Sequence, residues 1–91
     1  FYIYIPNAFF PDGDRFNEVF SGSFIGVKEI KMEIFNRWGQ MVFSSTDLNF
    51  EWDGTYKGEK VQNGTYVWKL IYLPQDRNDR EFFTGHVTIL D

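Results

Sequence analysis

Four oxygen-bearing side chains near the start of this sequence form its one cluster with the composition of a metal site. They are Asp12, Asp14, Asn17 and Glu18. Ca²⁺ binds about six to eight oxygens, and a tight turn with side chains at alternate positions supplies several carboxylates together with backbone carbonyls. Bound Ca²⁺ is therefore the one cofactor that these residue types indicate.

The same four side chains also have an interpretation that needs no metal. An EF-hand is excluded, because counting from Asp12 places Ser23 where Glu is required and Asn17 where Gly is required. Asp12 and Asp14 can accept hydrogen bonds from their own backbone in Asx-turns, while Asn17 and Glu18 complete a capped helical turn. We favour the turn and cap, with Ca²⁺ as the alternative.

Catalytic chemistry finds little support in the sequence. There is no Cys nucleophile, and His86 is the single His, in a strand-like pattern with no sequence-local partner that would define a triad. Carboxylates are numerous, but nothing singles out a pair that would act as acid and base. We predict a protein that is not an enzyme, with His86 as an ordinary strand residue.

Three tryptophans, Trp38, Trp52 and Trp68, are candidates for a sugar-stacking platform. Packing is the favoured interpretation, because large aromatic side chains dominate the core of a small protein without disulfides. Trp68 lies in the middle of a strand pattern and is predicted to be buried. Trp38 and Trp52 lie beside turns and are predicted to pin hairpin corners.

The composition is that of one small acidic domain, and we expect residues 1–91 to form a single unit excised from a longer protein. The 91 residues include eleven Phe, five Tyr and three Trp, and no Cys. A net charge of -4 with scattered cations argues against nucleic acid as a partner. No apolar run approaches the ~20 residues that span a bilayer, so we expect no membrane insertion.

Alternation of apolar and polar residues with period 2, broken by frequent turn formers, predicts an all-β, immunoglobulin-like antiparallel sandwich of about seven strands. A short helical turn is expected near Asp14 to Phe20. Asn63-Gly64 is predicted to form a type I′ hairpin turn. The strand segments are expected at residues 1–5, 27–37, 40–45, 51–56, 65–73 and 81–90.

Side-chain alternation also predicts which strand faces meet the core. Ile30, Met32 and Ile34 share one face of the segment at 27–37 and should be buried. Both faces of the segment at 65–73 are largely apolar, which predicts a central strand covered on each side. Asn36-Arg37-Trp38-Gly39 should form the hairpin corner between the segments at 27–37 and 40–45, where Met41 and Phe43 alternate.

Several short motifs follow one another in a fixed order and resemble a known family. The matching positions are Pro6, Asn7, Phe9, Pro11, Gly13, Asp14, Asn17, Phe20, Asn36, Arg37, Trp38, Gly39, Trp52, Asp53, Gly54, Gly64, Tyr66 and Gly85. The resemblance is to the gliding motility-associated C-terminal domain, the type B sorting domain of the type IX secretion system, and it spans essentially the whole chain.

The resemblance implies a non-catalytic sorting signal from gliding and related Bacteroidota bacteria. It implies a covalently linked N-terminal cargo that is exported through the periplasm to the cell surface or the medium. The implied partners are the type IX secretion machinery and a dedicated outer-membrane protein. Two rivals are a calcium-dependent, Ig-like adhesion or carbohydrate-binding module, and a small hydrolase that would need a deep pocket of converging carboxylates.

Overall fold

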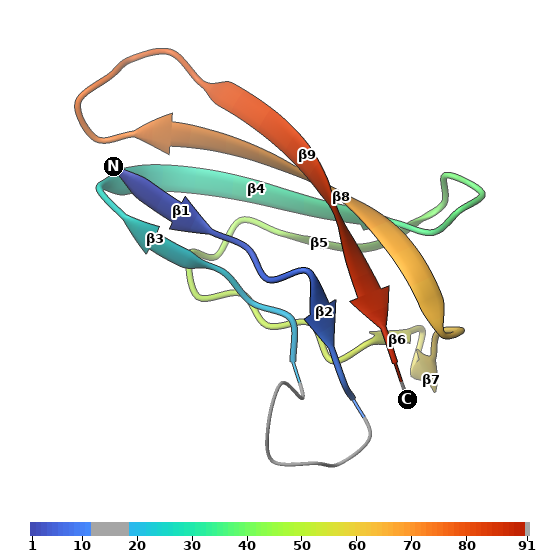
Figure 1. Ribbon diagram of the computed structural model, residues 1–91. Coiled ribbons are helices and arrows are strands. Elements are labelled where there is room, and N and C mark those ends of the chain that lie inside the picture. Colours follow the sequence, from blue (N-terminus) through green and yellow to red (C-terminus); the bar gives the residue numbers. More distant parts are fainter. Residues whose placement is uncertain (12–18, 91) are drawn as a thin grey trace.

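The computed structural model describes residues 1–11 and 19–90, and all the regular secondary structure of these residues is strand (Figure 1). The all-β sandwich expected from the sequence is confirmed. No helix in this part of the chain is long and apolar enough to cross a membrane. The strands are β1 (Tyr2–Tyr4), β2 (Ala8–Phe9), β3 (Ser23–Ile25), β4 (Val27–Phe35), β5 (Met41–Ser45), β6 (Thr55–Tyr56), β7 (Glu59–Lys60), β8 (Gly64–Pro74) and β9 (Glu81–Ile89).

A five-stranded sheet in the order β2-β9-β8-β4-β5 forms the main layer. The antiparallel pair β1-β3 contributes the second layer, and its residues Ile3 and Phe24 pack against the core. A third pair, β6-β7, is a small hairpin near β5. The structure therefore has more strands than the expected seven because several of them are only two or three residues long.

The core lies against one face of the large sheet, as side-chain alternation predicts. Ile30, Met32 and Ile34 of β4 are buried, and the register places Met32 opposite Leu70 and Ile34 opposite Trp68. Successive side chains of a strand point to opposite faces, so one face of β4 collects the apolar side chains from Ile30 to Ile34. The predicted burial of Trp68 is confirmed.

Aromatic side chains from the loops fill the space beneath the sheet. The ring of Phe9 lies 5.9 Å from that of Phe20 and 5.6 Å from that of Trp52, and Phe50 lies 6.0 Å from Phe20. Tilted contacts at these centroid distances are favourable beyond the area that they bury. Large rings thus supply the core area that a chain of this length otherwise lacks.

The strand pairing departs from the antiparallel expectation in one place. β2 pairs with β9 in parallel, with Ala8 opposite Thr88 and Phe9 opposite Ile89, whereas the other paired strands are antiparallel. Most of the predicted helical turn at Asp14 to Phe20 falls outside the described residues. At its end, Phe20 forms a β-bridge with Trp52 rather than a helical turn.

The prediction of a type I′ hairpin at Asn63-Gly64 is wrong. The positive φ values required at two successive residues occur at Lys57 (54°) and Gly58 (84°), which connect β6 to β7. Only Gly64 of the Asn63-Gly64 pair has a positive φ, 144°, and it begins β8. The segment after Asn63 pairs with β4 and β9, which are distant in sequence, so no local hairpin forms there.

The predicted alternation in β5 is also wrong. A register shift between Ile34 and Phe35 places Met41 opposite Phe35 and Phe43 opposite Ile34, so β5 has one extra residue. Val42 is buried and Met41 is exposed. A β-bulge of this kind changes the direction of the side chains that follow it.

The outer face of β8 is more open than predicted. Val67 is 37% exposed, and Ile71 is only partly buried, although Leu73 is buried. β8 is central in hydrogen-bonding order, between β9 and β4, but the second layer covers only its inner face. The prediction that β8 is covered on both faces is therefore wrong for much of its outer face, although the side chains of that face are largely apolar.

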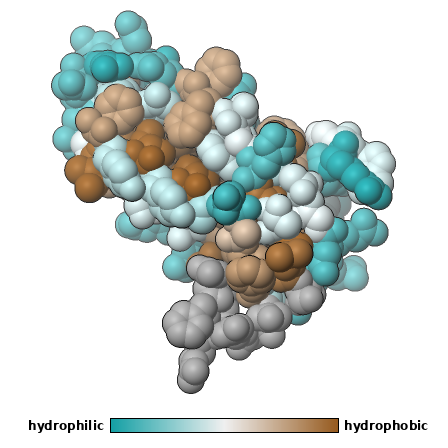
Figure 2. All heavy atoms as spheres, viewed as in Figure 1, coloured by the Kyte–Doolittle hydropathy of each residue, from teal (hydrophilic) through white to brown (hydrophobic). Residues whose placement is uncertain are grey.

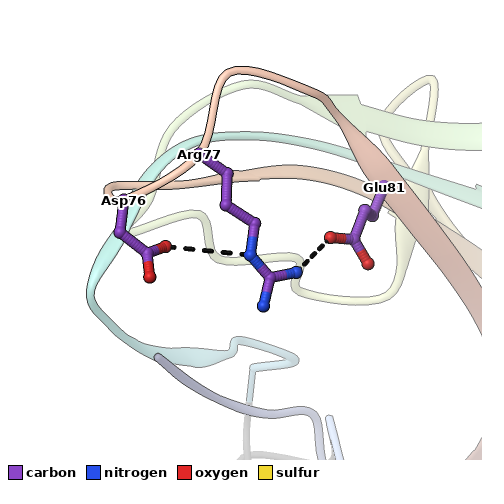
Figure 3. Close-up of polar contacts among 3 residues, drawn as sticks. All are labelled: Asp76, Arg77 and Glu81. Atoms are coloured by element: carbon purple, nitrogen blue, oxygen red, sulfur yellow. Dashed lines mark hydrogen bonds and ion pairs between the residues drawn. The ribbon is translucent and has the colours of Figure 1, made fainter.

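The turn that joins β8 to β9 is held by ion pairs. Arg77 donates from Nη1 to Glu81 Oε2 at 2.5 Å, and its Nε lies 3.9 Å from Asp76 Oδ1 (Figure 3). Arg80 also contacts Glu29, which lies on β4. These pairs are solvent-exposed and each contributes little stability. They lie where the turn meets the start of β9, since Glu81 is the first residue of that strand.

Candidate recognition surface

The β4-β5 hairpin is built by Asn36. Its backbone N–H donates to the carbonyl of Gln40 at 2.9 Å, and its side-chain Oδ1 accepts from the N–H groups of Trp38 at 3.0 Å and Gln40 at 2.9 Å. Gly39 has a φ of 81°, in the left-handed region that favours glycine. The predicted hairpin corner is confirmed, and Asn36 and Gly39 shape it.

Arg37 and Trp38 project from the tip of this hairpin. Trp38 is 69% exposed, so the prediction that it pins the corner by packing is wrong. The guanidinium carbon of Arg37 lies 4.4 Å from the centre of the Trp38 ring, a cation–π contact. No carboxylate among the described residues forms an ion pair with Arg37. The pair is thus available to a partner, and Trp and Arg are the residue types enriched in binding hot spots.

Two small hollows adjoin Trp38. One, of about 60 Å³, is lined by Asn36, Arg37 and Trp38 together with residues 62–66. The other, of about 280 Å³, lies between Trp38 and the β6-β7 hairpin. Pockets for drug-sized ligands are commonly about 300–1,000 Å³. The first hollow is far too small for such a ligand and suits a single side chain, and the second lies just below this range.

The second motif group, Trp52 to Gly54, serves the fold. Trp52 is 2% exposed, pairs with Phe20 through two backbone hydrogen bonds, and donates from Nε1 to the carbonyl of Thr55 at 2.9 Å. Asp53 Oδ1 accepts from the hydroxyl of Thr55 at 2.6 Å and from its N–H at 3.1 Å. Gly54 has a φ of 82°, as the predicted turn at Asp53-Gly54 requires.

The later motif residues are structural as well. Tyr66 is buried, and its hydroxyl donates to the carbonyl of Gln62 at 2.7 Å. Burial raises the pKa of Tyr66 above its ordinary value, and the charge of Arg37 lowers it by a smaller amount. Gly85 lies directly beneath the ring of Trp68. The Tyr66 hydroxyl and Gly85 therefore both take part in the packing and hydrogen bonding of the fold.

The first motif group closes the sandwich at β2. The carbonyl of Asn7 accepts from the N–H of Thr88 at 2.9 Å, and Phe9 is fully buried. Pro11 lies close to Gly54, where an added Cβ would approach it to 3.3 Å. Pro6, which precedes Asn7, is partly buried.

The proposed cation ligands and the remaining motif positions lie outside the described residues. They are Asp12, Gly13, Asp14, Asn17 and Glu18. Among the described residues, no group of three or more His, Asp or Glu side chains is placed to hold a metal ion. His86 is exposed on β9 opposite Val67, as predicted for a strand residue.

Burial of Trp52 and Trp68 contradicts a platform made of the three tryptophans. The motifs thus divide into positions that build the fold and the exposed pair Arg37 and Trp38. The sequence predicts the place of both residues in the hairpin, but it does not predict their exposure. The spacing of Asn36 and Gly39 could have indicated this exposure. These two residues form the turn, so the two residues between them lie at its tip.

The family model CHU_C, described as the Type IX secretion signal domain, matches residues 3–89. Neither a curated protein nor a solved structure matches the chain. Because the match covers nearly all of the sequence and agrees with the motif order, the chain belongs to the CHU_C family of type IX secretion signal domains, whose role is that of a C-terminal sorting signal.

Proposed function

We propose that this domain is a non-catalytic sorting signal, and that its exposed residues Arg37 and Trp38 are recognised by a dedicated outer-membrane partner of the type IX secretion machinery. Residues 1–91 would act as one domain, joined covalently to an N-terminal cargo. The cargo would pass through the periplasm to the cell surface or the medium. Family membership supports export, and the exposed pair supports the choice of recognition site.

The observation that carries the choice of site is the contrast between Trp38 and the other tryptophans. Trp52 and Trp68 are buried in the core, whereas Trp38 is exposed and contacts the guanidinium of Arg37. An exposed indole gains free energy when a partner covers it. An arginine stacked on it presents donors in a planar fork that suits carboxylates and carbonyl groups.

A secretion assay tests the proposal directly. A reporter with a periplasmic signal peptide and this domain at its C-terminus should leave a cell that has a working type IX system. Trp38→Ala should reduce export by at least about tenfold, equivalent to about 1.4 kcal/mol of lost binding. Its melting temperature should change little, because exposed side chains contribute little to stability.

Ile25→Ala is the matched control. Ile25 is 67% exposed, nearly as much as Trp38, but it lies on β3 in the second layer. Its replacement should leave export unchanged. Arg37→Lys should give an intermediate loss, since a lysine keeps the charge but not the planar stacking group. Equal export of wild type and Trp38→Ala would remove the hairpin tip as the site while leaving the sorting role intact.

A further inference from the structure

β9 is paired along its whole length on one side but only at its end on the other. β8 pairs with β9 from Glu81 to Ile89, whereas β2 pairs only with Thr88 and Ile89. Figure 1 shows β2 beside the final part of β9 alone. Residues 82–86 therefore form a sheet edge without a neighbouring strand among the described residues.

The contacts of β2 reveal which backbone groups of β9 point outward. The N–H of Thr88 donates to the carbonyl of Asn7 at 2.9 Å, and that of Leu90 donates to the carbonyl of Phe9 at 3.2 Å. Even-numbered residues of β9 thus direct their N–H and C=O groups away from β8. Alternate residues of a strand repeat this direction, and the β8-β9 register has no shift that would change it.

The same alternation applies to the open stretch. Phe82, Thr84 and His86 direct their N–H and C=O groups outward, in line with the groups that bind β2. No backbone partner for them is present among the residues that the structure describes. A row of unpaired donors and acceptors of this kind is a template for an added strand.

This stretch also lacks the features that protect exposed edges. Proteins commonly block a free edge with Lys, Pro or a bulge. Residues 82–86 read F-F-T-G-H, with none of these, and Phe82 is 64% exposed. At the opposite edge, β5 is five residues long and pairs with β4 through a register shift.

An aromatic row adjoins the open edge on the inner face. The ring of Phe83, 37% exposed, meets that of Trp68 edge-on at 5.3 Å and that of Tyr72 at 5.7 Å. Phe1 continues the row, 5.5 Å from Tyr72. Figure 2 shows apolar side chains reaching the surface where the start of β1 and the start of β9 lie. Alternate side chains of an added strand would pack on this row.

We propose that the open edge of β9, residues 82–86, pairs with an extended strand of the partner that recognises this domain. The added strand would have apolar side chains at alternate positions. Main-chain hydrogen bonds provide affinity in this binding mode, and contacts of alternate side chains provide specificity. The inference rests on the proposed function, which supplies the partner. It adds a second contact to the hairpin tip and does not depend on Trp38.

A single strand fits this edge better than a second copy of the domain. Antiparallel pairing of two β9 strands about Thr84 would bring residue 80 of the copy opposite residue 88. β2 already occupies that position. The turn before β9, held by Arg77 and Glu81, would therefore meet β2, whereas a short extended segment would not.

Proline substitution tests the role of the outward N–H. Thr84→Pro removes one outward donor, and proline is tolerated on an edge strand when its nitrogen faces solvent. Thr84→Ala removes the same side chain but keeps the N–H, so it is the matched control. In the export assay, Thr84→Pro should lose about tenfold in exported reporter. Thr84→Ala should export like wild type, and both variants should keep the wild-type circular dichroism spectrum.

The outcomes separate this inference from the sorting role. Retention of the wild-type reporter would overturn the proposed function itself. Equal export of wild type and a folded Thr84→Pro variant would overturn the strand-addition site and leave the sorting role standing. If Thr84→Pro does not fold, photo-cross-linking of the folded protein decides the question.

For cross-linking, a photoreactive phenylalanine analogue replaces Phe82 in the full reporter in exporting cells. The control carries it at Ser44, which is exposed on the opposite edge strand β5. The analogue at 82 should form an adduct with a different protein, and the analogue at 44 should not. No adduct at 82, adducts of equal yield at both positions, or an adduct of two reporter chains would each overturn the proposal.

Discussion

The indole ring of Trp68 covers Gly85 so closely that residue 85 has no room for a side chain. A Cβ built on Gly85 would lie 2.3 Å from Trp68 Cζ2 and 2.7 Å from Cε2. The two residues are opposite each other in the β8-β9 register, and Gly85 does not have a positive φ. The glycine is therefore required by packing rather than by backbone conformation.

Gly85→Ala should destabilise the domain by about 1–3 kcal/mol, the usual cost of overpacking. The measurement is urea unfolding followed by fluorescence. In a Trp68→Leu background, the same substitution should cost much less, because the ring that it meets is gone. A double-mutant cycle isolates this coupling. Additive costs would show that the contact is not what excludes a side chain at 85.

The two buried tryptophans should respond differently to replacement by phenylalanine. Trp52 Nε1 donates to the carbonyl of Thr55, whereas Trp68 Nε1 is buried without a hydrogen-bond partner in the described structure. Trp52→Phe should therefore cost about 1–2 kcal/mol more than Trp68→Phe, because it also removes a hydrogen bond. Chemical denaturation of both variants provides the comparison. A larger loss for Trp68→Phe would contradict this assignment.

Stability should fall in strongly alkaline solution. Burial raises the pKa of Tyr66 above 10.0, so between pH 10.0 and the folded pKa the unfolded chain has lost a proton that the folded chain retains. The free energy of unfolding then decreases as pH rises. Tyr66→Phe should flatten this decline in denaturant titrations across that range. Burial also raises the pKa of Tyr72, with Glu81 adding to the shift, so Tyr72→Phe should flatten it too.

Calcium binding by Asp12, Asp14, Asn17 and Glu18 stays a proposal, with a thermal test. A ligand that binds only the folded state stabilises it by about 2.7 kcal/mol at a hundred times its Kd. Millimolar Ca²⁺ should raise the melting temperature, and EDTA should reverse the rise. Asp14→Ala should abolish the effect, while Asp79→Ala, an exposed acidic residue in the β8-β9 turn, should preserve it. Identical melting with Ca²⁺ and EDTA would leave the turn and cap as the only interpretation.

Long strands were predictable from the sequence because their side-chain period is local. Ile34 was assigned to the core from alternation and Trp68 from its place in the middle of a strand pattern, and the register places them opposite each other. The hairpin at Asn36 to Gly39 was predictable for the same reason, since its hydrogen bonds join residues within one turn.

Features that depend on distant partners were not predictable in this way. The bulge that buries Val42 reflects the register of β5 on β4, and the parallel pairing of β2 joins opposite ends of the sequence. Which side chains of the candidate site are exposed also depends on distant segments and could not be predicted from the local sequence. Trp38 and Trp52 both lie beside turns, yet one faces solvent and the other contacts Phe9 and Phe43. Which one is covered depends on segments far away in the chain.

Because β2 pairs with β9 in parallel, the domain can complete its main sheet only when the last strand of the chain is present. Ala8 finds its neighbour only when Thr88 is present, so the sheet cannot close around a chain that is broken before the last strand. Pairing between residues so distant in sequence slows folding. A chain that ends before Thr88 would therefore lack the closed sheet, even though nearly all of the domain's other strands had been made.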